Sequence, residues 1–322
     1  MKIRHTLLAS SLALALLNLA ACNSAPQAAA PPAVQQTAAA QAASAAYDFD
    51  MDVFHPVVAH HGMVATEQAL ASQIGLNILK GGGNAVDAAV AIGFALAVAL
   101  PNAGNLGGGG FMMVYDAKTG KSVALDFREM APRAATRDMY LDAKGNVVDG
   151  KSLYTHYAVG VPGTVAGMEH ALKTWGTMPL AKVVAPAAAL AEQGYPVSET
   201  LAKVLLQTKK TMGQWPATQA IFWKNGEPLK AGDLLVQKDL AASMRLIGSE
   251  GAKAFYEGAI ATRIAAEMAS HKGALTLEDL HSYKVVEREP TRGTYRGYEI
   301  VTMPPPSSGG VVIAMVAGML PL

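Results

Sequence analysis

An arginine set between two acidic residues is the most chemically suggestive feature of this 322-residue sequence. Arg128 follows Asp126 and precedes Glu129 in the run DFREMAP. A guanidinium group can bind a carboxylate through two parallel hydrogen bonds, which the ammonium group of lysine cannot imitate. It can equally pair with its own acidic neighbours. Taken by themselves, these residues favour a structural salt bridge and leave a carboxylate-binding role open.

Two further runs combine unusual backbone properties with polar groups. Residues 107–110 are four consecutive glycines, which allow a close approach of the backbone and can direct amide N–H groups at an anion. Residues 304–310, PPPSSGG, form a rigid run before an expected helix, whose N-terminus Ser307 or Ser308 can cap. Neither serine lies in a G-x-S-x-G elbow or has an obvious histidine and aspartate set. We expect a tight glycine turn packed under a sheet and a capping serine, and contact of either serine with substrate stays open.

The histidines and the single cysteine show no ligand pattern. The eight histidines include no HExxH or similar spacing, and we expect His60, His61 and His156 to be solvent or loop residues. The sequence therefore predicts no metal ion and no cofactor. It also lacks a GxGxxG run that opens a helix, which disfavours dinucleotide binding. One cysteine rules out a disulfide framework.

Two helices are predicted ahead of the glycine run. Residues 65–80 place apolar side chains four apart and end before Gly81, which is typical of an amphipathic helix with a glycine stop. Residues 85–100 carry a single charge, follow Asn84 as an N-cap, and end at Pro101. This second run is too short to cross a bilayer. We expect it to be a core helix between layers, because a helix that is apolar all round is buried.

Strand patterns place Arg128 at the end of a hairpin. Residues 111–116 and 122–127 are β-rich runs around a glycine-containing turn, which predicts an antiparallel hairpin that delivers DFREMAP at its end. Residues 294–303 alternate like one further strand. Thr276 resembles the start of a capping box in which Asp279 replaces the usual glutamate. Helical spacing recurs at 163–175, 179–193, 237–247 and 252–269.

The N-terminal region has the sequence of an export signal followed by a flexible linker. Residues 1–21 join a short basic start, an apolar run and small residues, which is typical of an export signal peptide. Residues 19–22, LAAC, resemble the lipobox of bacterial lipoproteins, which implies a diacylglycerol-modified Cys22; ordinary cleavage after Ala21 is the alternative. Residues 22–47 then comprise the acylated cysteine and a disordered Ala/Pro/Gln linker, and the folded domain occupies 48–322. We expect a lipid-anchored protein of the periplasm or cell envelope, whose membrane contact is its N-terminal lipid.

The amino-acid composition excludes several other classes of protein. Half of the residues are hydrophobic (51%) and 16% are charged, which is a globular composition. Without Lys2 and Arg4 of the signal, 24 basic residues face 25 acidic ones. A nucleic-acid partner is not expected, because binding to phosphates needs a basic surface.

Seven blocks in order closely resemble bacterial γ-glutamyltranspeptidases, also called glutathione hydrolases. They are GMVAT (62–66), ILKGGGNAVDAAVA (78–91), NAGNLGGGGFM (102–112), DFREMAPRAATRDM (126–139), GVPGTVAGM (160–168), AIFWKNGEPLKAGD (220–233) and MPPPSSGG (303–310). The resemblance implies an α+β N-terminal-nucleophile hydrolase fold, a four-layer αββα sandwich, here incomplete at the C-terminus. It also implies a precursor that cuts itself into a large and a small subunit, and a threonine nucleophile at the new N-terminus.

The same resemblance implies a role for Arg128 as the group that holds the α-carboxylate of a glutathione-like γ-glutamyl donor. The family's other site groups belong to the small subunit of the same precursor, and none has a counterpart in residues 1–322. We therefore expect no catalytic residue in this chain, and no activity from these residues alone. Alternatives are a β-lactam acylase or poly-γ-glutamate depolymerase of the same fold, or an inactive binding lipoprotein.

Overall fold

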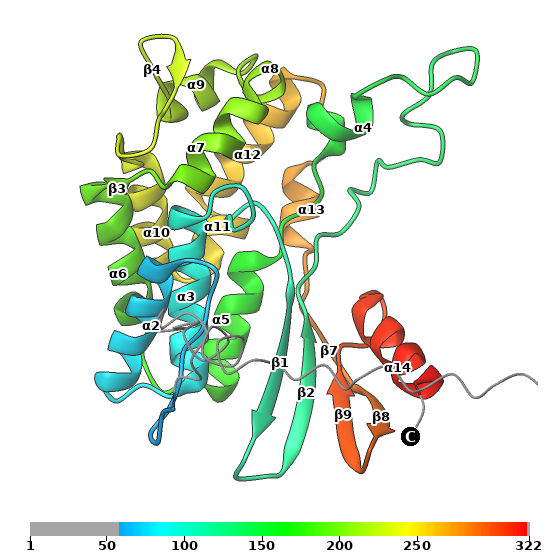
Figure 1. Cartoon of the computed structure of the whole chain (residues 1–322). Helices are drawn as coiled ribbons and strands as arrows, with labels where there is room; N and C mark the ends of the chain where they lie inside the picture. Colours follow the sequence, from blue (N-terminus) through cyan, green and yellow to red (C-terminus); the bar gives the residue numbers. More distant parts are fainter. Residues whose placement is uncertain (1–57, 321–322) are drawn as a thin grey trace, which may run out of the picture. The chain divides into compact units, whose positions relative to one another are not determined.

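The computed structural model describes residues 58–320, in which helices alternate with short strands (Figure 1). The helices are α2 (Ala69–Lys80), α3 (Ala85–Ala99), α4 (Lys151–Tyr154), the 3-10 helix η2 (His156–Ala158), α5 (Thr164–Trp175), α6 (Leu180–Gln193), α7 (Glu199–Gln207), α8 (Lys209–Met212), α9 (Pro216–Phe222), α10 (Lys238–Glu250), α11 (Lys253–Tyr256), α12 (Ala259–Ser270), α13 (Leu277–His281) and α14 (Gly309–Met319). The strands are β1 (Phe111–Asp116), β2 (Lys121–Asp126), β3 (Tyr195–Pro196), β4 (Trp223–Lys224), β5 (Glu227–Pro228), β6 (Leu234–Leu235), β7 (Val286–Arg288), β8 (Thr291–Tyr295) and β9 (Tyr298–Thr302).

Helix α2 is shorter than its sequence pattern. It begins at Ala69 rather than at residue 65, because Gln68 is the N-cap, with an extended backbone and a side chain that accepts a hydrogen bond from the Leu70 N–H. Gly81 ends the helix as predicted. The left-handed residue that redirects the chain is the next one, Gly82, with φ of 87°.

Helix α3 is the buried core helix that the sequence predicts. Val90, Phe94 and Val98 are fully buried, and the helix packs against α2, α5 and α6. Its main neighbours are therefore three helices. No helix within residues 58–320 combines the length and the apolarity needed to span a bilayer.

The single charge on α3 anchors its N-terminus. Asp87 and Asn84 form a capping box, and the Asp87 carboxylate also accepts hydrogen bonds from the Thr177 N–H (2.8 Å), the Thr177 hydroxyl (2.6 Å) and the Met178 N–H (3.0 Å). Burial by itself would raise the pKa of Asp87, but these hydrogen bonds outweigh it and lower the pKa. The charge thus ties the start of α3 to the loop between α5 and α6.

The predicted hairpin is confirmed and gains a third strand. β1 and β2 pair antiparallel with Phe111 opposite Asp126, and β7 pairs with β2 on its other edge. Helix α5 packs on β2. The sequence pattern did not indicate β7, which is only three residues long. This sheet carries DFREMAP at the end of its central strand.

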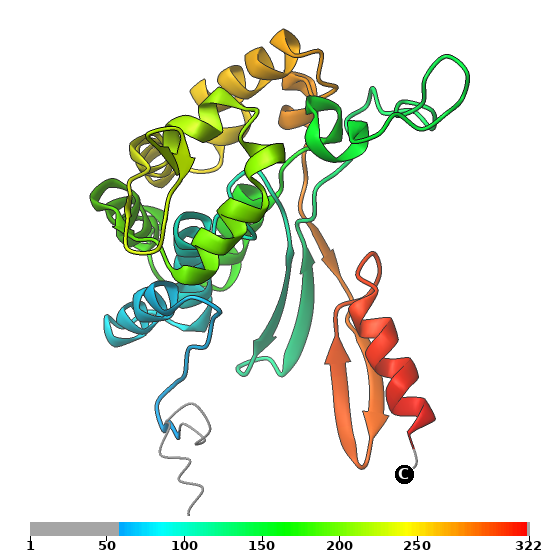
Figure 2. The same ribbon diagram turned by 45° about the horizontal axis from the view of Figure 1, so that its top comes forward.

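The strand predicted at 294–303 is wrong, because the region is a hairpin. β8 and β9 pair antiparallel, with Tyr295 opposite Tyr298, around a two-residue turn (Figure 2). Arg296 and Gly297 in that turn have φ of 48° and 81°. Positive φ at both central residues is the requirement of a type I′ hairpin turn, and the alternating pattern runs through it unbroken. Helix α14 packs on β8.

The later helical predictions are confirmed with one correction. Helices α5, α6 and α10 occupy three of the four predicted stretches, and Thr276 and Asp279 form the predicted capping box at α13. The fourth stretch, 252–269, is two helices, α11 and α12. Gly258 separates them because it has an extended backbone, with ψ of −151°.

Candidate functional site

The backbone of Arg128 is fixed on both sides. Its N–H donates to Oδ1 of Asp126 (3.0 Å), and its carbonyl oxygen accepts a hydrogen bond from the hydroxyl of Tyr283 (2.9 Å). Two residues further on, Met130 exchanges backbone hydrogen bonds with Val161 in both directions (3.1 and 2.8 Å). The position of the Arg128 Cα is therefore set by the sheet and by two distant segments.

The side chain of Arg128 is exposed and does not form the local salt bridge that the sequence favours. Asp126 instead pairs with Arg288 of β7, whose Nε lies 2.9 Å from Oδ2. Within the described residues, the one hydrogen bond of the Arg128 guanidinium runs from Nη1 to the carbonyl oxygen of Pro306 (3.4 Å). Most of its donors are thus free to bind a ligand.

The glycine run allows the close approach predicted for it, and the neighbour is the Arg128 segment. A Cβ added at Gly109 would lie 2.6 Å from the carbonyl oxygen of Phe127 and 2.7 Å from the amide nitrogen of Glu129. Gly110 exchanges backbone hydrogen bonds with Phe127 (3.2 and 3.0 Å). The run therefore packs beside the chain leaving β2, and no side chain fits between them.

The carbonyl oxygen of Gly108 adds a second link. It accepts hydrogen bonds from the N–H groups of Gly163 (2.8 Å) and Thr164 (3.0 Å), at the start of α5. These are among the amide groups of a helix that have no partner within the helix. The glycine run thus joins α5 to the end of β2.

Arg128 lies between two cavities. One, of about 570 Å³, is lined by Asn105, by Gly108 of the glycine run, by the segment after Arg128, and by residues 157–160. The other, of about 330 Å³, is lined by Asp126, Tyr283, Lys284, Arg288 and Pro306, among others. Arg128, Glu129 and Met130 border both. A ligand in either cavity can reach the guanidinium group.

Burial and negative charge keep Tyr283 protonated. Burial raises the pKa of its hydroxyl, and the nearby carboxylates of Asp126 and Glu129 raise it further. The hydroxyl therefore stays a donor to the Arg128 carbonyl oxygen across the neutral range. Tyr283 also stacks on Tyr256, with ring centroids 5.7 Å apart. Sequence reasoning missed Tyr283, because nothing near it in the chain indicates a contact with Arg128.

The two serines of residues 304–310 make few hydrogen bonds in the structure. The Ser307 hydroxyl accepts a hydrogen bond from the Gly309 N–H (3.4 Å), whereas Ser308 is the N-cap residue of α14 and its side chain makes no capping bond. Whether Ser307 or Ser308 contacts substrate stays an open question. The structure does bring this loop to Arg128 through Pro306.

The histidines and the cysteine discussed from the sequence lie elsewhere. His60 and His61 are exposed in a loop, as predicted. The expectation that His156 is a solvent or loop residue is wrong, because it is half-buried in η2 and lies beside Glu267 and His271. Cys22 and the rest of the predicted signal and linker lie outside the described residues.

Comparisons with known proteins find relatives along most of the chain. A model of the family described as gamma-glutamyltranspeptidase matches residues 71–321. A glutathione hydrolase proenzyme of Escherichia coli is 54% identical over 85% of this chain and 47% of its own length. The crystal structure of Helicobacter pylori gamma-glutamyltranspeptidase superimposes with a TM-score of 0.78 at 47% identity, over 80% of this chain and 74% of that one. An acylase ACY 1 proenzyme of Pseudomonas is 40% identical over 82% of this chain and 48% of its own length.

These likenesses define an α+β protein of the N-terminal-nucleophile hydrolase fold. The β1–β2 hairpin, the buried helix α3 and the arginine that follows β2 are consistent with this class. Within that class, the chain belongs to the γ-glutamyltranspeptidase family. It spans about half the length of the curated relatives it matches.

Proposed function

We propose that this chain is the donor-binding portion of an enzyme that transfers a γ-glutamyl group from glutathione-like donors to water or to amino acids and peptides. The observation that carries the proposal is the state of Arg128: its backbone is anchored at both ends while its guanidinium stays exposed between two cavities. Family membership supports the reaction class.

Arg128 would hold the donor by its α-carboxylate. A guanidinium group binds a carboxylate through two parallel hydrogen bonds, which fix the orientation of the ligand as well as its place. Orientation matters because the carbonyl group to be attacked lies at the other end of the glutamyl side chain, several bonds from the α-carboxylate. A fixed Arg128 backbone limits the positions that this carbonyl group can take.

The nucleophile would come from the small subunit of the same precursor. The family resemblance implies a threonine freed at the small subunit's N-terminus, whose own α-amine can act as the base for its hydroxyl. A partner is also consistent with α14, which exposes the apolar side chains of Val312, Ile313, Met315 and Met319. Such a surface is typical of a contact with another polypeptide.

A test compares hydrolysis of a γ-glutamyl anilide by the processed two-subunit protein with that of its Arg128→Ala variant. Loss of one partner of a desolvated charge pair costs at least about 2 kcal/mol, so we expect KM to rise about 30-fold or more. Unchanged kinetics in Arg128→Ala would contradict the assignment of Arg128. No cleavage by the unsubstituted processed protein would contradict the γ-glutamyl reaction itself.

Acyl transfer from a β-lactam side chain is the second candidate, because relatives called acylases share the same portion of the chain. Assaying an acyl β-lactam beside the γ-glutamyl anilide separates the two. Faster turnover of the β-lactam would favour the acylase. A poly-γ-glutamate chain, added as a third substrate, tests the depolymerase alternative.

We also propose that the protein is exported and anchored by a lipid on Cys22. The basis is the sequence of residues 1–22, with its apolar run and lipobox-like end. An anchor of this kind holds the exported enzyme at the cell envelope, on the outer surface of the membrane through which the enzyme was exported.

A further inference from the structure

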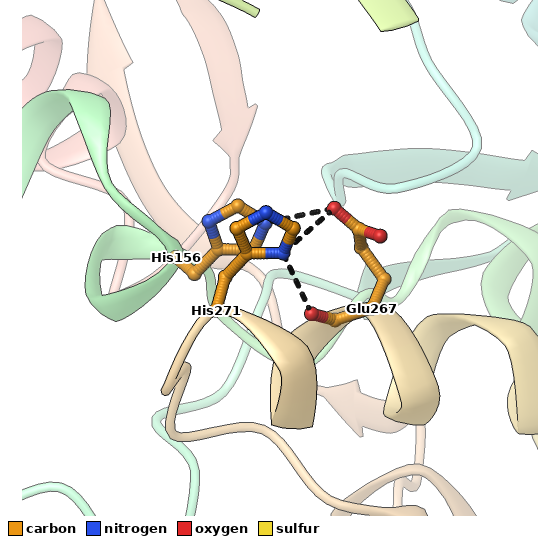
Figure 3. A group of neighbouring side chains, drawn as sticks. All are labelled: His156, Glu267 and His271. Carbon is orange, nitrogen blue, oxygen red and sulfur yellow. Dashed lines mark hydrogen bonds and ion pairs between the residues drawn. The ribbon is translucent and has the colours of Figure 1, made fainter.

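Three side chains with metal-ligating atoms converge outside the cavities that Arg128 borders (Figure 3). His156 comes from η2, Glu267 from α12, and His271 is the C-cap of the same helix. Nε2 of His156 lies 3.2 Å from Oε1 of Glu267, and Nδ1 of His271 lies 3.1 Å from that same oxygen. Two segments more than a hundred residues apart thus direct two imidazole nitrogens at one carboxylate oxygen.

The spacing of these atoms suits a metal ion. Ligand atoms about 2.0–2.1 Å from a tetrahedral zinc ion lie about 3.3 Å from one another. Both nitrogen-to-oxygen separations, 3.2 and 3.1 Å, are close to that value. The imidazole rings are stacked with centroids 4.3 Å apart and planes 6° from parallel, and Nδ1 of His271 also lies 2.8 Å from Oγ of Ser270 and 3.2 Å from the carbonyl oxygen of Glu267. Binding of one ion by both rings would therefore require the more exposed His271 ring to turn away from these partners.

The surroundings hold the His156 ring in place before any ion arrives. Its side chain is only 14% exposed, against 47% for His271 and 59% for Glu267. The indole ring of Trp215 meets both imidazoles edge-on, at 5.3 and 6.4 Å. Gly273 leaves the space that His156 needs, because a Cβ there would lie 3.0 Å from the Cβ of His156. A ligand fixed in this way loses little side-chain entropy when it binds.

We propose that His156, Glu267 and His271 bind one divalent transition-metal ion of the zinc type. Two imidazoles and a carboxylate are the donor set that zinc, copper and nickel accept, whereas magnesium and calcium prefer oxygen ligands. Three protein ligands leave a position for water, which the exposure of Glu267 and His271 permits. The ion would tie α12 to His156 in η2, and the residues that follow His156, 157–160, line the larger cavity beside Arg128.

The site can be tested by calorimetric titration of the purified protein with Zn²⁺, in a Cys22→Ser background so that no thiol competes. We expect one saturable site per chain and no saturable binding of Mg²⁺. His271→Ala and Glu267→Gln should each weaken Zn²⁺ binding at least about tenfold, because loss of even an outer-shell partner of a ligand costs about that much. Co²⁺ should give a visible absorption band that both variants lose.

The matched control is His170→Ala, because His170 also pairs with a glutamate, Glu287, at 2.7 Å on the protein surface. Its Zn²⁺ affinity should equal that of the parent. Glu267→Gln keeps the side-chain shape, so a loss of binding with an unchanged circular dichroism spectrum cannot come from unfolding. Absence of saturable Zn²⁺ binding to the parent, or binding that survives both His271→Ala and Glu267→Gln, would overturn the site.

Discussion

Arg128 combines a rigid backbone with an exposed, mostly unengaged guanidinium group. Of its two acidic neighbours, Asp126 is occupied, because it binds Arg288 and the Arg128 amide, and Glu129 forms no ion pair with Arg128 within residues 58–320. That division of partners explains how an arginine in an acidic run can remain available to a substrate carboxylate.

Arg128→Lys should separate charge from geometry. Lysine keeps the positive charge but cannot make two parallel hydrogen bonds, so we expect KM for a γ-glutamyl donor to rise at least about tenfold. Steady-state kinetics of the processed protein measure this. Arg292→Lys is the control, because Arg292 forms an exposed ion pair with Glu299 in the hairpin that follows β7. Equal KM values in Arg128→Lys and the parent would speak against bidentate binding.

Gly109→Ala should disturb the Arg128 segment without touching substrate. The new Cβ would meet backbone atoms of Phe127 and Glu129, which cannot rotate away, so overpacking should destabilise the protein by about 1–3 kcal/mol. Urea unfolding measures the change. Gly293→Ala is the control, since a Cβ at Gly293 meets nothing within 4 Å. A stable Gly109→Ala protein with normal KM would show that the close approach is dispensable.

At the scale of elements, helix α3 depends both on its local sequence and on hydrogen bonds to residues far away in the chain. Its apolar sequence and its Asn84 cap are visible in the chain, but the partners of Asp87 include residues some 90 positions away. The hairpin β8–β9 shows the opposite case. There the alternation of side chains is the same on both strands, and only the positive φ of Arg296 and Gly297 divides them.

Asp87→Asn should loosen the start of α3. The amide group cannot accept all the hydrogen bonds that the carboxylate receives, and hydrogen bonds to a charged group contribute about 1.5–3 kcal/mol. We expect a loss of that size in the free energy of unfolding at pH 7. Asp116→Asn, at the end of β1 beside the turn of the β1–β2 hairpin, is the comparison and should change stability less.

At the scale of the whole molecule, buried carboxylates predict how stability depends on pH. Burial raises the pKa of Asp87 and of Asp279, but their hydrogen bonds outweigh it and lower both below the ordinary value of 3.8. Groups with a lowered folded-state pKa stabilise the protein above their unfolded pKa and lose that contribution as the pH falls through the folded value. Stability should therefore decline from about pH 5 downward.

The pH dependence can be assigned with the Asp87→Asn variant. Its stability deficit at pH 7 should shrink as the pH falls below 3.8 and through the lowered folded-state pKa, because first the unfolded and then the folded parent protonates the same carboxylate. Thermal unfolding at a series of pH values measures both proteins. A deficit that stays constant down to pH 2 would show that the Asp87 charge does not contribute.

Cys22→Ser tests the proposed anchor of the whole protein. Without the thiol no diacylglycerol can attach, so the protein should move from the membrane fraction to the soluble fraction of cells, as shown by immunoblotting. Mass spectrometry of the N-terminal peptide of the parent should find the lipid on Cys22. An unmodified chain that begins at Cys22 would favour ordinary cleavage after Ala21.

Local sequence determined the features that depend on neighbours a few residues away. The apolar run of α3, the capping box at Thr276 and the β1–β2 hairpin follow from spacing and cap chemistry, which act within one or two turns of the chain. The seven family-like blocks also indicated the fold class and the importance of Arg128. The break at Gly258 was missed because a glycine permits a helix as well as a break.

Tertiary structure alone decided which distant groups meet. Arg288 pairs with Asp126 from 162 residues away, and His156 reaches Glu267 from 111 residues away, although no spacing in the sequence links them. The physical reason is that an ion pair or a ligand set needs atoms within a few ångströms, and the folded backbone, rather than sequence distance, sets that proximity. The free guanidinium of Arg128 is therefore a property of the fold.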